Sequence, residues 1–549
     1  MELRQTNLIH VIERVLTAPF RKHFLFLIAF LVFTAGTDVI RQCSLQLYPN
    51  AFYMAAYGFC LAYGVTLLIS LIKNNKLRTI IQAILIIAAS VSFALNFYCI
   101  LELDDTFDKD FALLLMETNW NEAHEFVTSM LPLKIVLILG AIYSIFLVLW
   151  RLSRRHNLNL GRKGSIIALI AALVFIPLTI SQWHVCRYGP IHRITEFAKV
   201  YDVPYDLKSY YTHPSIDYAD TELMPSNVVL IIGESFARFH SSLYGYEKNT
   251  NPHLNALRDS SLLFTFDSIE SPAATTSLSF RYMLSTFDKT DDTRQDKHWY
   301  EYTTLIELMQ DCGYDSYWFS TQARGGYING SARVYARACE KSWFLQKPGA
   351  VLNNNETLDI VLADSSRVFS DTINQSKRHF VIYHMMGSHF DYKMRYPKEF
   401  DHFKPKDYSD CPTEQQEILA SFDNSILYND YIVEKLIELY DDKETVVIYL
   451  SDHGQDMFRS APDYFMHGKE NDPASYQYGI EIPFMVYLSP AYQARHPQIV
   501  ELLRNGQNNP KKWNSDYLPY MILDLIGVSG IDGEAIKPYS LFSSDIEPN

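Results

Sequence analysis

Residues 228–235 read Val-Val-Leu-Ile-Ile-Gly-Glu-Ser, an aliphatic run that ends abruptly in a glycine and a carboxylate. A short, continuous apolar run is typical of a strand buried on both faces, as in a parallel sheet. Further β-rich runs lie at Ser316–Ser320, Phe380–His384, Thr445–Leu450 and Pro483–Leu488, with helical patterns at Tyr302–Asp311, Glu414–Tyr440 and Trp513–Ile526. This alternation predicts an α/β domain over residues 227–549, with a mostly parallel sheet covered by helices.

The part of the chain before this domain differs in composition. Five nearly charge-free stretches are each close to the roughly 20 residues that a membrane-spanning helix needs. They are Phe24–Ile40, Ala51–Ile72, Thr79–Ile100, Leu131–Trp150 and Ser165–Trp183. We therefore predict a transmembrane domain over residues 1–183, and a Tyr- and Pro-rich bridge over residues 184–226.

Basic residues indicate how the five spans are oriented. Arginine and lysine gather before the first span, between the second and third, and between the fourth and fifth, whereas the loop after the third span is acidic. Basic loops stay in the cytoplasm. Five spans that start inside therefore place the bridge and the α/β domain outside the membrane.

The loop between the third and fourth spans, residues 103–130, is too long for a simple turn. Its pattern is amphipathic, which favours one or two helices lying at the outer membrane–water boundary. Thr118 and Glu122 are four residues apart, so they would share one face of such a helix.

Composition excludes several broad classes of protein. The chain has 549 residues, of which 48% are hydrophobic and 20% charged, with a formal net charge of −14. The apolar fraction is too high for a disordered chain, and the acidic balance argues against nucleic acid as a partner. The charge-free stretches exclude an entirely soluble protein, and the long α/β domain excludes a simple multi-span transporter.

Polar side chains follow three of the predicted strands. Glu234 follows the first, His389 follows Phe380–His384, and Asp452-His453 follow Thr445–Leu450, while a further loop supplies His467. In open parallel sheets, sites form beyond the carboxyl ends of the strands. Carboxylates and imidazoles together suit Zn²⁺ or a similar divalent ion. Each motif alone is also compatible with a hydrogen-bonded pair or a helix cap, but their shared position favours a metal site.

A metal in that position could activate a hydroxyl as a nucleophile. The candidate is Thr275 or Thr276, at the predicted start of a helix in the stretch Ser271–Ser285. Free backbone N–H groups at a helix N-terminus favour a phosphate group or an alkoxide. A plain helix cap would use the same residue types, and the pattern by itself does not separate the two threonines.

Several motifs together resemble the phosphoethanolamine transferases of Gram-negative envelopes, a family that includes lipid A-modifying enzymes behind polymyxin resistance. They are Gly233-Glu-Ser-Phe-Ala-Arg, His384-Met-Met-Gly-Ser-His, Tyr449-Leu-Ser-Asp-His-Gly and Met466-His-Gly. The five-span N-terminus and Glu117-Thr-Asn-Trp-Asn-Glu are also similar, so the resemblance extends over nearly the whole chain.

The resemblance implies an alkaline-phosphatase/sulfatase-like domain on a five-helix anchor. It implies one zinc ion held by Glu234, Thr276, Asp452 and His453, with Thr276 as the metal-activated nucleophile. His389 and His467 match residues that contact the phosphoethanolamine group or a second zinc. Further substrate-binding residues would be Thr118 and Glu122. The lysine that the family has near the substrate has no obvious counterpart here, and Arg324 would serve in its place.

The implied reaction transfers phosphoethanolamine from phosphatidylethanolamine through a covalent intermediate. The acceptor would be lipid A, the lipopolysaccharide core or another envelope glycan, and the chain would be a multi-pass protein of the bacterial inner membrane with a periplasmic catalytic domain. Pro272-Ala273 and Arg281-Tyr282 replace the family's cysteine-containing pairs around the nucleophile, so that disulfide is expected to be absent. No pairing of Cys186, Cys312, Cys339 and Cys411 follows from their spacing.

Three alternatives compete with this interpretation. A phosphoglycerol transferase of the lipoteichoic-acid-synthase type resembles the same architecture and metal set. A sulfatase is disfavoured, because its Cys/Ser-x-Pro-x-Arg nucleophile motif is missing. A catalytically inactive envelope scaffold is disfavoured by the full ligand set. The identity of the acceptor, the number of metal ions and the oligomeric state stay open.

Overall fold

The chain folds into two compact units in a computed structural model. One unit comprises residues 1–115 and 130–202, and the other comprises residues 116–129 and 203–549. The structure describes residues 10–103, 106–107, 111–112, 115, 118, 123–124, 126–127, 131–155, 159–186, 189, 191, 193, 195, 206–267, 269–287, 297–322, 331–346, 358–369, 377–467, 472–509 and 512–542.

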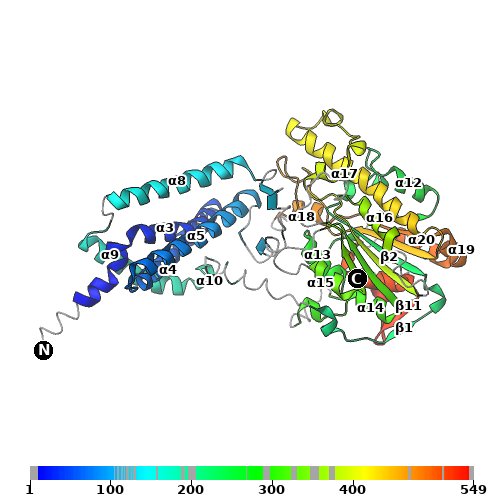
Figure 1. Cartoon of the computed structure of the whole chain (residues 1–549), viewed down its shortest axis with the longest axis horizontal. Helices are drawn as coiled ribbons and strands as arrows, with labels where there is room; N and C mark the ends of the chain where they lie inside the picture. The colour runs from blue at the N-terminus through cyan, green and yellow to red at the C-terminus, as the bar shows by residue number, and fades with distance from the viewer. Residues whose placement is uncertain are drawn as a thin grey trace. The chain divides into compact units, whose positions relative to one another are not determined.

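Among the residues that the structure describes, the first unit contains five helices long and apolar enough to cross a membrane. They are α3 (Phe24–Ser44), α4 (Tyr48–Ser70), α5 (Asn75–Tyr98), α8 (Leu133–Arg155) and α9 (Arg162–Ser181), and a π-helical turn, η1 (Cys99–Leu103), extends the third. Helices α3, α4 and α5 pack along one another (Figure 1) around a core that includes Phe33, Ala62 and Phe93. The expectation of five spanning helices is confirmed.

Short helices flank the spanning ones, with α2 (Ala18–Lys22) before α3 and α10 (Trp183–Cys186) after α9. The predicted interfacial helices at residues 103–130 lie mostly outside the described residues.

The second unit is built on a seven-stranded sheet in the order β3-β9-β8-β2-β7-β5-β6. The strands are β2 (Asn227–Gly233), β3 (Leu263–Phe266), β5 (Tyr314–Ser320), β6 (Lys341–Phe344), β7 (Arg378–His384), β8 (Thr445–Ser451) and β9 (Phe484–Leu488). Strands β8, β2, β7, β5 and β6 pair in parallel, whereas β9 runs antiparallel to both β8 and β3. The predicted mostly parallel sheet is confirmed.

Helices cover both faces of this sheet, as the alternation of side chains along β2 requires. Val228, Leu230 and Ile232 join a core with α13 (Thr276–Met283), α14 (Leu305–Asp311), α15 (Ser331–Ala338), α20 (Pro497–Gln507) and α21 (Leu518–Leu525). Val229 and Ile231 join the opposite core, with α12 (Pro252–Asp259), α16 (Ile360–Phe369) and α17 (Thr413–Ile437). Figure 1 shows α16 and α17 on one side of β2, and α13, α14 and α15 on the other.

Smaller elements complete this unit. Strands β1 (Ile216–Tyr218), β11 (Val528–Ile531) and β12 (Glu534–Ala535) form a three-stranded sheet, and β4 (Ile269–Glu270) pairs with β10 (Trp513–Asn514). The helix predicted from Trp513 starts only at Leu518, because Trp513 and Asn514 pair with β4 and a 3₁₀ turn follows them. Helices α18 (Pro473–Ile480) and α19 (Pro490–Arg495) flank β9 along the chain.

Candidate metal centre

Four neighbouring parallel strands end at one edge of the sheet. Strands β8, β2, β7 and β5 are consecutive in the sheet order, so their carboxyl ends lie side by side. Asp452 and His453 follow β8, Glu234 follows β2, the loop with His389 follows β7, and Gln322 follows β5. The fold therefore gathers these side chains at one place, although they are distant in the sequence.

Three of these residues form a tight, buried cluster. Glu234, Asp452 and His453 are at most 1% exposed, and each offers a ligand atom within 4.8 Å of the others. His453 Nε2 lies 3.3 Å from Glu234 Oε1 and 3.5 Å from Asp452 Oδ2. Two carboxylates and an imidazole facing one another are a donor set suited to zinc.

The threonine at the first position of α13 completes the group. Thr276 Oγ1 lies 3.3 Å from Glu234 Oε2 and 3.4 Å from His453 Nε2. Thr275 is instead the N-cap residue of α13, with extended backbone and no side-chain capping bond. Of the two threonines that the sequence left open, Thr276 is the one whose hydroxyl faces the cluster.

Backbone hydrogen bonds hold Asp452 in a defined orientation. Its Oδ1 accepts hydrogen bonds from the N–H of Ser235 at 3.1 Å and of His453 at 2.7 Å. Its Oδ2 is buried, accepts no hydrogen bond from the described residues and faces the His453 imidazole. A buried carboxylate oxygen without a donor costs free energy unless a cation or water satisfies it, so the cluster fits a bound metal ion.

A backbone contact also orients the imidazole of His453. Its Nδ1 lies 2.9 Å from the carbonyl oxygen of Gly454, and an Nδ1–H that donates to this oxygen leaves Nε2 as the ligand atom. Gly454 itself is confined, because an added Cβ would lie 2.5 Å from the Tyr478 carbonyl oxygen.

Burial and mutual charge shift the pKa values of the cluster. Burial, together with the nearby Glu234 carboxylate, raises the pKa of Asp452 to about 7. Burial disfavours the charged form of His453, but the Asp452 and Glu234 carboxylates outweigh it and raise its pKa to about 9. Burial also opposes ionisation of Glu234, yet its hydrogen bond to His453 brings its pKa well below the usual value. Without a cation, the cluster therefore holds protons near neutral pH.

Two supporting residues were not predicted from the sequence. Gln322 Nε2 donates to Glu234 Oε2 at 2.9 Å and to the Met385 carbonyl at 3.0 Å. Asp359 is buried and accepts hydrogen bonds from the N–H of Met386 and of Gly387, both at 2.9 Å. Gln322 is the second residue after a predicted strand and could have been found by that signal. Asp359 follows no strand, and only the fold reveals its role.

The two predicted substrate histidines border the centre. The His467 ring lies 3.9 Å from the His453 ring, measured between centroids, and its Nδ1 lies 2.7 Å from the Ala274 carbonyl oxygen. Burial, reinforced by the charge of His453, lowers the pKa of His467 to about 3, which keeps this ring neutral. His389 Nδ1 lies 2.7 Å from the Phe390 carbonyl, and Arg395 donates to the His389 carbonyl at 2.8 Å.

The remaining predicted site residues lie in segments that the structure describes only in part. Thr118 is half-buried within the segment 116–129, which belongs to the same unit as the sheet. Glu122 and Arg324 lie outside the described residues. Pro272-Ala273 and Arg281-Tyr282 stand around Thr276, so these positions provide no cysteine for a disulfide there.

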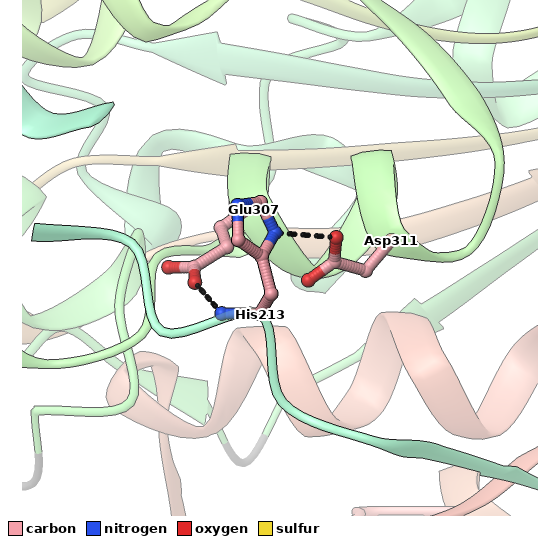
Figure 2. A group of neighbouring side chains, drawn as sticks. All are labelled: His213, Glu307 and Asp311. Carbon is pink, nitrogen blue, oxygen red and sulfur yellow. Dashed lines mark hydrogen bonds and ion pairs between the residues drawn. The ribbon is translucent and has the colours of Figure 1, made fainter. Parts of the chain in front are cut away.

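A second group of potential metal ligands has a structural explanation. Figure 2 shows His213, Glu307 and Asp311, with the His213 ring 3.0 Å from Asp311 Oδ1. Glu307 Oε1 already accepts from the backbone N–H of Thr212 at 2.6 Å and of His213 at 2.8 Å. Glu307 also forms a capping box with Thr304 at the start of α14, so this group attaches residues 212–213 to the helix.

A cavity of about 570 Å³ lies elsewhere in the second unit. It is bordered by residues 393–405 and by α17, and none of the four clustered residues lines it. The polar cluster at the sheet edge, rather than this cavity, is therefore the candidate catalytic centre.

Two family models match the chain. The sulfatase model matches residues 226–528, more than half of the chain, and a model described as phosphoethanolamine transferase EptA/EptB matches residues 61–205. Phosphoethanolamine transferase EptC of an Escherichia coli O18:K1:H7 strain is 26% identical over 488 residues, covering 83% of this chain and 81% of the relative. Phosphoethanolamine transferase EptA of Helicobacter pylori is 30% identical over 292 residues, covering 52% of this chain and 51% of the relative.

Solved structures share the fold at lower identity. The integral membrane lipooligosaccharide phosphoethanolamine transferase A of Neisseria meningitidis superimposes with a TM-score of 0.66 at 20% identity, covering 94% of this chain and 97% of that one. The periplasmic domain of Escherichia coli EptC in complex with Zn superimposes with a TM-score of 0.51 at 24% identity, covering 61% of this chain and 92% of that one. Both units therefore have counterparts in one solved membrane protein.

Proposed function

The chain belongs to the sulfatase family and, within it, to the phosphoethanolamine transferases, and on this premise we propose that it transfers phosphoethanolamine from a lipid to an envelope acceptor. The main support for the proposal is the short distance from Thr276 Oγ1 to Glu234 and to His453, 3.3 and 3.4 Å. A hydroxyl held between a carboxylate and an imidazole at a helix N-terminus is arranged as a nucleophile for phosphorus.

Zinc is the proposed cofactor. Glu234, Asp452, His453 and Thr276 would hold one ion, which fits the buried Asp452 oxygen that lacks a donor. A bound zinc ion supplies Lewis acidity, which lowers the pKa of the hydroxyl and neutralises charge on the phosphoryl group. A second ion near His389 and His467 stays part of the proposal, since these rings border the same centre.

The first half-reaction forms a covalent intermediate. Thr276 Oγ1 gives up its proton and bonds to the phosphorus of phosphatidylethanolamine, and the bond from phosphorus to the diacylglycerol oxygen breaks. Diacylglycerol leaves with a proton on that oxygen. The N-terminus of α13, where Thr276 lies, is proposed to face the phosphoryl oxygens. His467 and His389 are proposed to hold these oxygens or to move the proton.

The second half-reaction regenerates the threonine. An acceptor hydroxyl or phosphate oxygen bonds to the same phosphorus, the bond to Thr276 Oγ1 breaks, and Thr276 regains a proton. The proposed acceptors are lipid A, the lipopolysaccharide core or a similar envelope glycan. Relatives named Kdo(2)-lipid A phosphoethanolamine 7''-transferase, 26–27% identical over about half of this chain, support this class.

The membrane anchor agrees with a lipid donor. A lipid with two acyl chains stays in the bilayer, so an enzyme that uses it gains by residing there. The five apolar helices and the distribution of basic loops support a multi-pass protein of the bacterial inner membrane, with the catalytic domain in the periplasm. Thr118, Glu122 and Arg324 are proposed to contact the substrate.

The test compares donors with purified full-length protein in liposomes. We expect transfer to Kdo2-lipid A from labelled phosphatidylethanolamine, and none from phosphatidylglycerol, which a phosphoglycerol transferase would use. Thr276→Ala should reduce transfer by more than about 10³-fold, in the range of losses seen for catalytic nucleophiles. Thr275→Ala is the matched control and should keep most activity. Equal loss in both variants, or use of the glycerol lipid alone, would refute the proposal.

A further inference from the structure

A buried ion pair lies inside the membrane unit and involves none of the residues of the candidate metal centre. Asp38 is on α3 and Arg193 follows α10, and both side chains are only 5% exposed. Arg193 Nη1 donates to Asp38 Oδ1 at 2.5 Å, and Nη2 donates to the carbonyl oxygen of Thr34 at 2.7 Å. Charged groups within a membrane-spanning unit are costly, and those that persist are paired and usually functional.

The pair lies near the outer ends of two spanning helices. With the N-terminus of the chain in the cytoplasm, both α3 and α5 run outward. Asp38 is six residues before the end of α3 at Ser44, which is roughly 9 Å along the helix axis. On α5, Asn96 is two residues before the end at Tyr98, and Ser92 Oγ accepts from Arg193 Nε at 3.4 Å. The polar group therefore lies beneath the outer surface of this unit.

Asn96 extends the network to a third segment. Its side-chain nitrogen donates to Thr37 Oγ1 at 2.7 Å and to Asp38 Oδ1 at 3.4 Å. Its oxygen accepts the backbone N–H of Phe107 at 2.8 Å. Asn96 is fully buried. Its amide nitrogen bonds to α3 and its amide oxygen bonds to the start of the loop after α5, so this side chain links the two segments.

Two segments that leave the membrane unit are thus attached to one polar network, Phe107 through Asn96 and Arg193 directly to Asp38. Residues 106–107 begin the loop that contains Thr118 and Glu122, and Arg193 lies in the stretch that leads into the catalytic domain. Asp38 Oδ2 is buried and accepts no hydrogen bond from the described part of the chain. Asp38 therefore depends on Arg193 for its neutralisation, and the bridge depends on Asp38 for this attachment.

We propose that Asp38 and Arg193 are positioning residues, which hold the loop after α5 and the bridge in place for transfer from a bilayer donor. The inference rests on the proposed function, since it assigns these residues to presenting the lipid and not to the chemistry at Thr276. Loss of the pair should therefore slow the reaction with a membrane-embedded lipid, and leave the reaction of a donor free in water unchanged.

The experiment measures two activities of the full-length protein in liposomes. The donors are dioleoyl-phosphatidylethanolamine in the bilayer, and dihexanoyl-phosphatidylethanolamine below its micellar concentration. Asp38→Asn and Arg193→Gln should reduce kcat with the bilayer donor at least tenfold, and change kcat/KM with the soluble donor less than twofold. The control variant, Arg162→Gln, breaks the exposed bidentate pair with Glu13 and should match the wild type with both donors.

The double variant Asp38→Asn/Arg193→Gln is the control for misfolding of the single variants. Removing both charges leaves no unpaired ion buried, so this variant should fold at least as well as either single variant, with a defect in bilayer transfer no larger than theirs. Limited trypsin digestion gives a readout besides activity. In Asp38→Asn, cleavage after Arg187 or Lys199 should be at least fivefold faster than in the wild type.

The outcomes separate the two proposals. Unchanged bilayer transfer in the single variants, or equal losses with both donors in the double variant, would overturn the positioning role. A wild-type protein that is inactive with both donors would refute the proposed function. In that case, the digestion rates alone decide whether the ion pair holds the bridge, and an unchanged rate in Asp38→Asn would overturn that role as well.

Discussion

At the scale of single residues, protons and a cation compete for the same atoms. Burial, together with the Glu234 carboxylate, raises the pKa of Asp452 to about 7. Burial lowers the pKa of His453, but the Asp452 and Glu234 carboxylates outweigh it and raise this pKa to about 9. A metal ion needs the carboxylate ionised and the imidazole neutral. Both shifts therefore oppose metal binding at acid pH and favour it as the pH rises.

This competition predicts how zinc affinity depends on pH. Between pH 5 and 7 each bound ion displaces about two protons, and between pH 7 and 9 about one, so the apparent affinity should rise about 100-fold and then about tenfold per pH unit. Competition with a chromophoric chelator at several pH values would measure it.

His213→Gln provides the control for this prediction. It alters the other cluster of potential ligands and should leave the profile unchanged. A flat profile, or one that His213→Gln abolishes, would contradict the assignment of the centre.

Several of these residues could be predicted because the sequence pattern that marks them lies directly beside them in the chain. Glu234, Asp452 and His453 each follow an apolar run directly, and parallel strands bring such positions together. The choice between Thr275 and Thr276 needed the resemblance, and in the structure the Thr276 hydroxyl lies 3.3 Å from Glu234 and 3.4 Å from His453. Asp359 could not be found, because its hydrogen bonds to the loop after β7 depend on tertiary packing.

At the scale of elements, the turn after β7 packs closely against the centre. Gly387 has φ +50°, and an added Cβ would lie 2.8 Å from the Glu234 backbone nitrogen and 2.9 Å from its carbonyl oxygen. Ser388 N–H donates to this same carbonyl at 2.9 Å. The loop with His389 is therefore fitted against the residue that would hold the metal.

Gly387→Ala should damage both stability and activity. The left-handed backbone and the contact with Glu234 together predict a loss of at least about 3 kcal/mol in unfolding free energy, with transfer reduced more than tenfold. Thermal unfolding of the solubilised protein would measure the first effect. The matched control is Gly245→Ala, because Gly245 has φ +93° but open space around its Cβ position, and its expected cost is only about 1–2 kcal/mol. Equal effects of the two variants would show that the close approach does not matter.

Helices and strands with a clear hydrophobic pattern in the sequence were predicted well. Elements that depend on pairing with a distant strand were not. The strands predicted from apolar runs agree with β2, β5, β7, β8 and β9 within two residues at each end. Strands β3 and β6 were missed, because they are four residues long and lie at the sheet edges. The helix predicted from Trp513 begins late because its first residues pair with β4, a contact that helical periodicity does not reveal.

At the scale of the whole molecule, the orientation of the spans decides where the chemistry takes place. Lys73 lies in the exposed basic loop between α4 and α5, and Lys406 lies on the surface of the catalytic unit. In a cysteine-free background, a membrane-impermeant maleimide added to spheroplasts should label Lys406→Cys but not Lys73→Cys. Permeabilised cells should label both. Labelling of Lys73→Cys in intact spheroplasts would reverse the assigned topology.

The central claim is that Thr276 forms a bond to the phosphorus of the donor lipid. The most direct measurement is peptide mass spectrometry of the full-length protein after incubation with phosphatidylethanolamine in the absence of acceptor. We predict one phosphoethanolamine group on Thr276, which disappears when the acceptor is added. A modification on Thr275 or another residue, with Thr276 unmodified, would contradict the account.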